Sequence, residues 1–119
     1  NIMIGTSMQM MAEAVVLAQK AGLDVAQTCE VIAGSAVGSP LVNYKVAPIS
    51  KGQYDPAFSV KLMEKDFDLA FAAAKQYGVS MPVTAVTRQF LAAAHASGKG
   101  DKDFSVLVQL LEEMCGIKR

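Results

Sequence analysis

The chain has 119 residues, of which 52% are apolar and 18% are charged, so it is long and apolar enough to fold as one domain with its own core. This composition excludes a disordered chain. Eleven basic and eleven acidic residues cancel, which leaves no broad basic surface for a nucleic acid backbone.

The first predicted helix covers Ile2 to Ala21. Its apolar residues recur at helical spacing and spread almost around the helix, so we expect a central, buried helix; they include Met3, Ile4, Met8, Met10, Met11, Val15, Leu17 and Ala18. Gln9 and Glu13 fall in the middle of the stretch, where a bilayer disfavours charged groups, so a membrane span is not expected. Inside an apolar helix, Glu13 needs a buried partner. Because the helical pattern begins at Asn1 without a preceding Met, we expect a fragment of a longer protein.

The second predicted helix runs from Val25 to Ala33. Gly22 suits the C-terminal end of the preceding helix, and the Asp24 side chain can cap the new one. A loop of small residues follows, from Gly34 to Ser39. It either offers backbone N–H groups to an anion at the start of the next helix or only connects two helices.

A third, short helix is predicted from Pro40 to about Val46. Ser39 can cap it, and Pro40 suits its first turn. Turn-forming residues then predict an exposed loop from Pro48 to Ala57, which separates the first helical group from the second.

The next predicted helix, from about Ser59 to Tyr77, is the most informative segment. Lys61 and Lys65 lie four residues apart and share one helical face. A cation on an amphipathic helix suits an anionic ligand such as a carboxylate or the phosphates of a dinucleotide, but such lysines often only cover a solvated surface. Both interpretations stay open. The apolar set expected to face the core is Val60, Met63, Phe67, Leu69, Ala70, Ala73 and Ala74.

Two more helices complete the chain. One runs from Pro82 to about Ala96, and the last runs from Asp103, a suitable cap, to Met114. Glu112 and Glu113 are expected to be solvated near the end of the last helix. No stretch alternates with period two, so the predicted fold class is all-α. In the helix from Pro82, the residues expected to point inward are Val83, Val86, Phe90, Leu91 and Ala94.

The chain has no GxGxxG, Walker or HExxH motif, and therefore cannot by itself supply a nucleotide-binding βαβ unit or a helical zinc site. The two cysteines, Cys29 and Cys115, are far apart and form no CxxC pair. The single histidine, His95, has no local motif that would make it part of a nucleophilic centre. We expect reduced thiols, no metal and a cytoplasmic protein.

Several short segments occur in a characteristic order: Asn1, Ala12-Glu13-Ala14, Ala21-Gly22-Leu23-Asp24, Ser39, Phe58, Lys65-Asp66-Phe67-Asp68-Leu69-Ala70, Met81-Pro82 and Asp103-Phe104-Ser105. Together they resemble the C-terminal helical domain of the β-hydroxyacid dehydrogenase family, which includes 3-hydroxyisobutyrate dehydrogenase, tartronate semialdehyde reductase and relatives of 6-phosphogluconate dehydrogenase. The resemblance covers essentially the whole chain. It implies that residues 1–119 form a helical substrate and dimerisation domain, and that the N-terminal Rossmann domain that holds NAD or NADP is absent from this sequence.

The resemblance also implies roles for individual residues. Asn1 matches the asparagine of the family's K-x-x-x-N motif, which orients substrate, and the catalytic lysine of that motif would lie four residues before Asn1. Lys65 matches the lysine of the family's K-D-L element, which contacts the cofactor, with Phe67 in place of the leucine. Asp66 is expected to anchor the helix rather than to catalyse, and Phe58 resembles an aromatic residue that walls the cleft.

We therefore expect part of an NAD(P)-dependent 3-hydroxyacid dehydrogenase or semialdehyde reductase, acting on a small hydroxy acid or semialdehyde. The fragment alone is expected to be inactive, because the Rossmann domain and the catalytic lysine lie outside it. The apolar first helix predicts a homo-oligomer, either a dimer or a tetramer, and neither nucleic acid nor membrane is expected as a partner. The alternative is a non-enzymatic helical module that oligomerises or binds a partner protein.

Overall fold

A computed structural model describes all 119 residues, and its regular elements are all helices, as predicted. An irregular turn at His95–Lys99 follows the fifth helix, and a 3₁₀ turn at Phe104–Val106 leads into the sixth. The six α-helices are α1 (Ile2–Lys20), α2 (Val25–Ala33), α3 (Pro40–Lys51), α4 (Val60–Tyr77), α5 (Pro82–Ala94) and α6 (Leu107–Met114).

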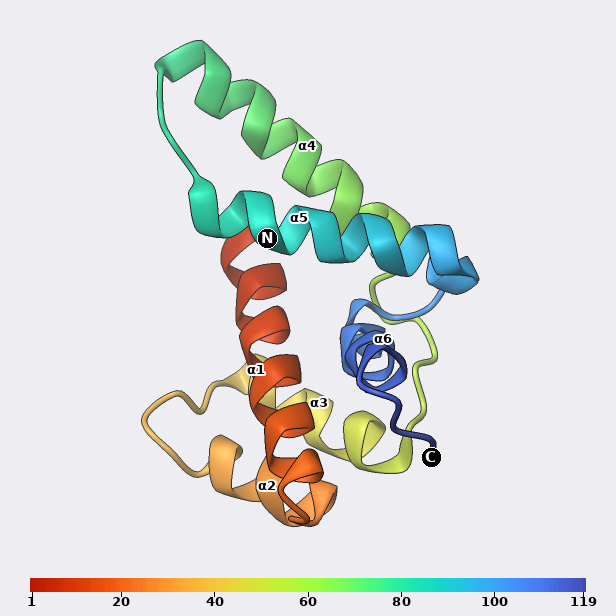
Figure 1. The fold of residues 1–119 in the computed structure, drawn as a ribbon. Coiled ribbons are helices and arrows are strands. Elements are labelled where there is room, and N and C mark those ends of the chain that lie inside the picture. The colour runs from red at the N-terminus through yellow and green to blue at the C-terminus, as the bar shows by residue number, and fades with distance from the viewer.

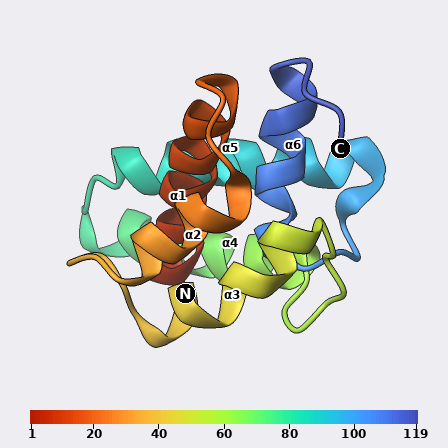
Figure 2. The same cartoon turned by 90° about the horizontal axis from the view of Figure 1, so that it is seen from below.

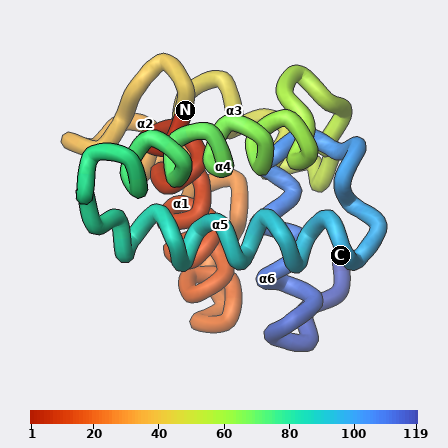
Figure 3. The backbone as a smooth tube through the Cα atoms, turned by 90° about the horizontal axis from the view of Figure 1, so that it is seen from above, coloured from red at the N-terminus to blue at the C-terminus, as the bar shows by residue number.

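The helices are arranged around α1. The hairpin of α4 and α5 lies across the N-terminal end of α1, whereas α2 and α3 lie toward its other end (Figure 1). Figure 2 shows α6 beside α1, and Figure 3 shows α4 and α5 side by side. One core joins these elements, and its largest fully buried side chains include Phe67, Met8, Ile49, Met63, Leu91 and Leu107.

Side-chain caps and glycines fix several helix ends, and those at Asp24, Ser39, Gly22 and Gly78 confirm the prediction from the sequence. The side chains of Asp24, Ser39 and Ser59 accept hydrogen bonds from backbone N–H groups three residues ahead, at the starts of α2, α3 and α4. Gly22 and Gly78 follow α1 and α4 with φ of +87° and +69°, a conformation that residues with a Cβ rarely adopt.

α1 is less buried than its pattern predicts. Met8, Ala12 and Val15 are in the core, but Met3 and Leu17 are 80% and 73% exposed, so the prediction of a helix covered on most sides is wrong for this domain alone. Glu13 is also exposed, and it accepts a hydrogen bond of 2.9 Å from Gln9 Nε2 instead of needing a buried partner. α1 is long and apolar enough to cross a membrane, a property that core helices share.

α3 continues to Lys51, beyond the predicted end near Val46. Pro48 lies inside the helix although it has no N–H to donate to the preceding turn. The helix persists because the next residue, Ile49, is fully buried in the core, and because Gly52 ends the last turn in the left-handed conformation. Core packing therefore outweighs the local preference of proline.

The outer parts of the α4–α5 hairpin are more exposed than predicted. Leu69, Val83 and Val86 were expected to face the core, but all three are exposed, since no other helix covers that face of the hairpin. The expectation for Glu112 was wrong in the opposite direction. Its carboxylate is buried on α6 and lies 2.7 Å from Nε of Arg119, because the tail after α6 folds back against the domain.

Candidate substrate and cofactor site

Asn1 and Asp66 bring the start of α1 into contact with the middle of α4. Nδ2 of Asn1 donates a hydrogen bond to Oδ2 of Asp66, although the two residues are 65 positions apart. They border an open hollow of about 280 Å³ that is completed by Ile2, Leu69 and Ala70. The structure therefore places Asn1, expected to bind substrate, directly beside the Lys65-Asp66 segment.

Lys65 lies on the next part of the same α4 surface. Its side chain is exposed and forms neither an ion pair nor a hydrogen bond, whereas Nζ of Lys61 lies 2.8 Å from Oδ1 of Asp101. The two lysines border an open hollow of about 490 Å³ together with Leu69, which also borders the hollow at Asn1. The two hollows thus adjoin along α4, and Lys65 is the lysine of this pair that is free to bind an anion.

The acidic residues of the larger hollow are all engaged. Arg88 of α5 donates two hydrogen bonds to Asp68, from Nε at 2.8 Å and from Nη2 at 3.2 Å, and a third from Nη1 to Glu64 Oε1 at 2.8 Å. The second oxygen of Glu64 contacts Nδ1 of His95. The hydrogen bonds from Arg88 lower the pKa of the Asp68 carboxyl. Sequence reasoning missed Arg88 and His95 as site residues, because their partners lie on another helix.

A buried ion pair fixes the segment that leads into α4. Nζ of Lys45 lies 2.7 Å from Oδ1 of Asp103, and Oδ2 of Asp103 accepts hydrogen bonds of 3.2 Å from the backbone N–H groups of Ala57 and Phe58. Burial alone raises the pKa of the Asp103 carboxyl, but the hydrogen bonds from Lys45 and Ser105 outweigh it and lower the pKa. Asp103 therefore stays ionised and holds the start of α4 in place.

Phe58, expected to wall the cleft, packs against Phe104. Its ring meets that of Phe104 edge-to-face, with 6.4 Å between centroids, and Nζ of Lys45 lies 4.7 Å from the centroid of Phe104. Phe58 is half-buried, so part of its ring remains accessible beside the start of α4.

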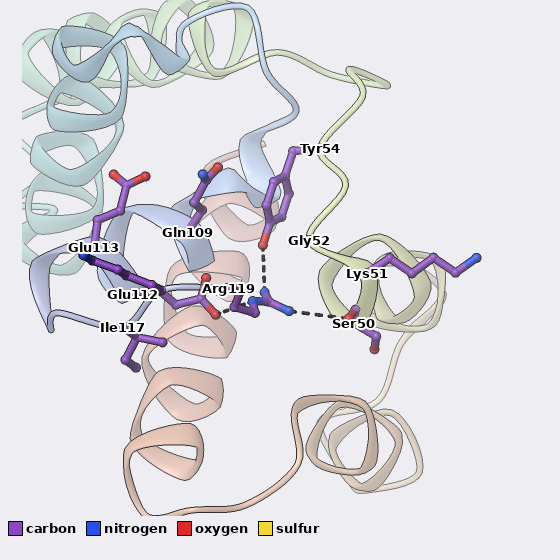
Figure 4. A pocket seen from close by; sticks show the side chains of 10 residues that line it. Ser50, Lys51, Gly52, Tyr54, Gln109, Glu112, Glu113, Ile117 and Arg119 are labelled. Atoms are coloured by element: carbon purple, nitrogen blue, oxygen red, sulfur yellow. Dashed lines mark hydrogen bonds and ion pairs between the residues drawn. The ribbon is translucent and has the colours of Figure 1, made fainter.

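Another hollow, of about 510 Å³, lies between the end of α3 and the tail after α6 (Figure 4). Arg119 crosses it and donates hydrogen bonds to the backbone oxygen of Ile49 at 2.8 Å and to the Tyr54 hydroxyl at 3.1 Å. Burial raises the pKa of Tyr54 to about 12. None of the residues that line this hollow borders the two α4 hollows, so we interpret the contacts of Arg119 as structural.

No group of three or more His, Cys, Asp or Glu side chains is placed to hold a metal ion. Cys29 and Cys115 are both free thiols, the first buried and the second exposed. Burial raises the pKa of the Cys29 thiol, which makes it a poor nucleophile at neutral pH. The chemistry that these residues offer is therefore binding through amide, ammonium and carboxylate groups.

Comparison with known sequences gives a consistent group of relatives. Residues 1–111 match the protein family described as NAD-binding of NADP-dependent 3-hydroxyisobutyrate dehydrogenase. Glyoxylate/succinic semialdehyde reductase 1 of Arabidopsis thaliana is 33% identical over 94% of this chain and 39% of its own length. 2-(Hydroxymethyl)glutarate dehydrogenase of Eubacterium barkeri is 33% identical over 98% of this chain and 39% of its own. The chain thus spans less than half of these relatives.

Solved structures share the fold. A 3-hydroxyisobutyrate dehydrogenase from Salmonella typhimurium superposes with a TM-score of 0.86 at 24% identity, over 92% of this chain and 38% of that one. A 3-hydroxyisobutyrate dehydrogenase from Mycobacterium tuberculosis, solved with L-serine, gives a TM-score of 0.81 at 29% identity, over 93% and 40% of the two chains.

Proposed function

The chain belongs to the β-hydroxyacid dehydrogenase family, and on this premise we propose that residues 1–119 form the helical C-terminal domain of an NAD(P)-dependent 3-hydroxyacid dehydrogenase or semialdehyde reductase. In this proposal an N-terminal Rossmann domain binds most of the NAD or NADP, and the helical domain completes the cleft. The helical domain alone is then inactive.

The contact between Asn1 and Asp66, beside an unpaired Lys65, is the observation that supports this proposal most directly. The amide of Asn1 can donate to and accept from a substrate hydroxyl or carboxylate, and Asp66 fixes the amide's orientation. The ammonium group of Lys65 suits the negative charge of a dinucleotide. Substrate and cofactor contacts would then lie on one continuous surface of α4.

The proposed proton donor is a lysine four residues before Asn1, which would share a helical face with it. NADH or NADPH, when bound, supplies a hydride to the carbonyl carbon of the substrate. The lysine would give its proton to the carbonyl oxygen and stabilise the negative charge that develops there, while Asn1 holds the substrate in place. In the reverse direction the same lysine accepts the hydroxyl proton.

We propose a small hydroxy acid or semialdehyde as the substrate. The names of the relatives support this class, since they include a glyoxylate/succinic semialdehyde reductase and a 2-hydroxy-3-oxopropionate reductase. The hollow beside Lys65 is lined mainly by charged side chains, which suit a small polar molecule better than a large apolar one. The proposed steps use no metal, and we propose a cytoplasmic enzyme, in which the thiols of Cys29 and Cys115 stay reduced.

We also propose that the protein is a homo-oligomer, a dimer or a tetramer. Met3 and Met10 on α1 and Val83 and Val86 on α5 are exposed, and α1 and α5 pack against each other. Apolar surface of this kind favours association. Light scattering of the complete protein should give a mass of at least two subunits, and a monomer would contradict this part of the proposal.

The enzymatic proposal is tested with the complete protein expressed from its whole gene. Nicotinamide absorbance is followed with NADH and NADPH and a panel of small 3-hydroxy acids and semialdehydes. We expect turnover that is lost when the lysine four residues before Asn1 is replaced, and kcat/KM about tenfold or more lower in Asn1→Ala. Asn43→Ala, an exposed asparagine on α3, is the matched control. A stable oligomer without turnover on any pair would favour the non-enzymatic module.

A further inference from the structure

Lys65 is surrounded by acidic side chains and yet pairs with none of them. Glu64 precedes it on α4, and Asp68 follows at a spacing of three residues, at which opposite charges on a helix normally meet. All three side chains border the same hollow of about 490 Å³. The absence of an ion pair at Lys65 therefore needs a structural cause.

Arg88 provides that cause. Its guanidinium engages both oxygens of Asp68, at 2.8 Å from Nε and 3.2 Å from Nη2, in the fork geometry that only arginine offers. Its Nη1 donates a hydrogen bond of 2.8 Å to one oxygen of Glu64, and Nδ1 of His95 contacts the other oxygen. Both carboxylate oxygens of Asp68 and both of Glu64 thus already have a partner.

The other charged groups around the hollow do not pair with Lys65 either. Lys61, one turn earlier on α4, has its own partner in Asp101 at 2.8 Å. Arg88 lies on α5 and His95 in the turn after it, and both reach partners on α4, which runs beside α5 (Figure 3). The arrangement leaves one cation, Lys65, free beside Asn1 and Asp66.

We propose that Arg88 is a positioning residue, which keeps the Lys65 ammonium available for an anionic dinucleotide by occupying the carboxylates of Asp68 and Glu64. The inference rests on the proposed cofactor contact of Lys65. Without Arg88, the freed Asp68 carboxylate would pair with Lys65 and compete with the ligand for it. Exposed ion pairs of this kind change equilibria by about two- to fivefold, so the dinucleotide should bind weaker by that factor.

The test is a set of NADPH and NADH titrations, followed by nucleotide fluorescence, on the complete protein. Arg88→Ala should weaken binding about two- to fivefold. Adding Asp68→Asn to it should restore most of the lost affinity, because the carboxylate three residues from Lys65 is then gone and Glu64 keeps its contact with His95. In a Lys65→Ala background, Arg88→Ala should cause no further loss. Arg88→Lys, which keeps the charge but cannot make the fork, should give a smaller loss that Asp68→Asn also reverses.

Thermal melting shows whether Arg88→Ala is folded. If it is not, Arg88→Lys is used for the same test. Equal losses from the Arg88 substitution with and without Lys65 would overturn the inference alone, since Arg88 would then act directly or through the fold. A loss that Asp68→Asn does not reverse would do the same. If Lys65→Ala binds NADH and NADPH normally, the proposed cofactor contact itself fails, and the role of Arg88 fails with it.

Discussion

Gly5 of α1 lies against the ring of Phe67 of α4, so closely that a Cβ atom on Gly5 would be 2.7 Å from Cε1 and Cζ of that ring. The two helices can cross at this distance only because Gly5 has no side chain. Asn1 lies one helical turn before Gly5, and Asp66 directly precedes Phe67. The close crossing therefore sets the position at which Asn1 meets Asp66.

Gly5→Ala is expected to lower the free energy of unfolding. The added methyl group overpacks the crossing at a cost of about 1–3 kcal/mol, and this cost should exceed the gain in helix propensity from alanine, which is about 1 kcal/mol. Urea denaturation measures the change. Combining Gly5→Ala with Phe67→Leu provides room for the methyl group. The double variant should therefore lose less stability than the two single variants lose together. Additive effects would show that the crossing tolerates a Cβ.

Asp103→Asn is expected to destabilise the domain by about 3–5 kcal/mol at neutral pH, because it leaves Lys45, whose side chain is 4% exposed, buried without its ionic partner. Asp101→Asn is the matched control, since Asp101 pairs with Lys61 at the surface and should matter by about 1 kcal/mol or less. Urea denaturation at several pH values measures both variants.

The effect of Asp103→Asn should also depend on pH. The folded protein lowers the pKa of Asp103 below its unfolded value of about 3.9, so the stabilisation is complete above that pH and is lost as the pH falls through the folded pKa. The difference between the unmodified protein and Asp103→Asn should therefore shrink in acid. A difference that stays constant down to the acid transition would mean that Asp103 stabilises through shape rather than charge.

The helix boundaries follow from the sequence because they are fixed locally. Asp24, Ser39 and Ser59 each bond to an N–H group three residues away, and Gly78 ends its helix through its own backbone conformation. Such interactions can be recognised without knowledge of the fold. The extension of α3 through Pro48 was missed because it depends on the burial of Ile49, a property of the folded core.

Periodicity identifies apolar faces but not what covers them. Met10 and Val86 lie on apolar stripes and are nevertheless exposed, because no element of this domain packs over them. The same limit applies to the candidate site. The family resemblance proposes Asn1 and Lys65 as site residues. Arg88 could not be proposed from the sequence, because it meets its two carboxylate partners, 20 and 24 residues away, only through the pairing of α4 with α5.

Arg119→Ala is expected to destabilise the domain by about 1–3 kcal/mol. Arg119 lies 2.7 Å from the Glu112 carboxylate, which is 4% exposed, and it also bonds to the end of α3, so its removal leaves a buried charge without a partner (Figure 4). Lys118→Ala is the control, because Lys118 is exposed and forms no ion pair. Chemical denaturation of the two variants compares them, and equal stabilities would show that the tail does not anchor α6.

Lys61 and Lys65 offer a direct test of which lysine serves the anion. Lys65→Ala is expected to weaken NADPH or NADH binding to the complete protein by about tenfold, the scale of a lost charge-assisted hydrogen bond. Lys61→Ala should cost less than that, because Lys61 already pairs with Asp101. Both side chains are exposed, so circular dichroism and melting temperature should be unchanged. Equal losses of affinity in the two variants would indicate a general effect of positive charge on α4. A specific contact requires a larger loss for Lys65, the unpaired lysine.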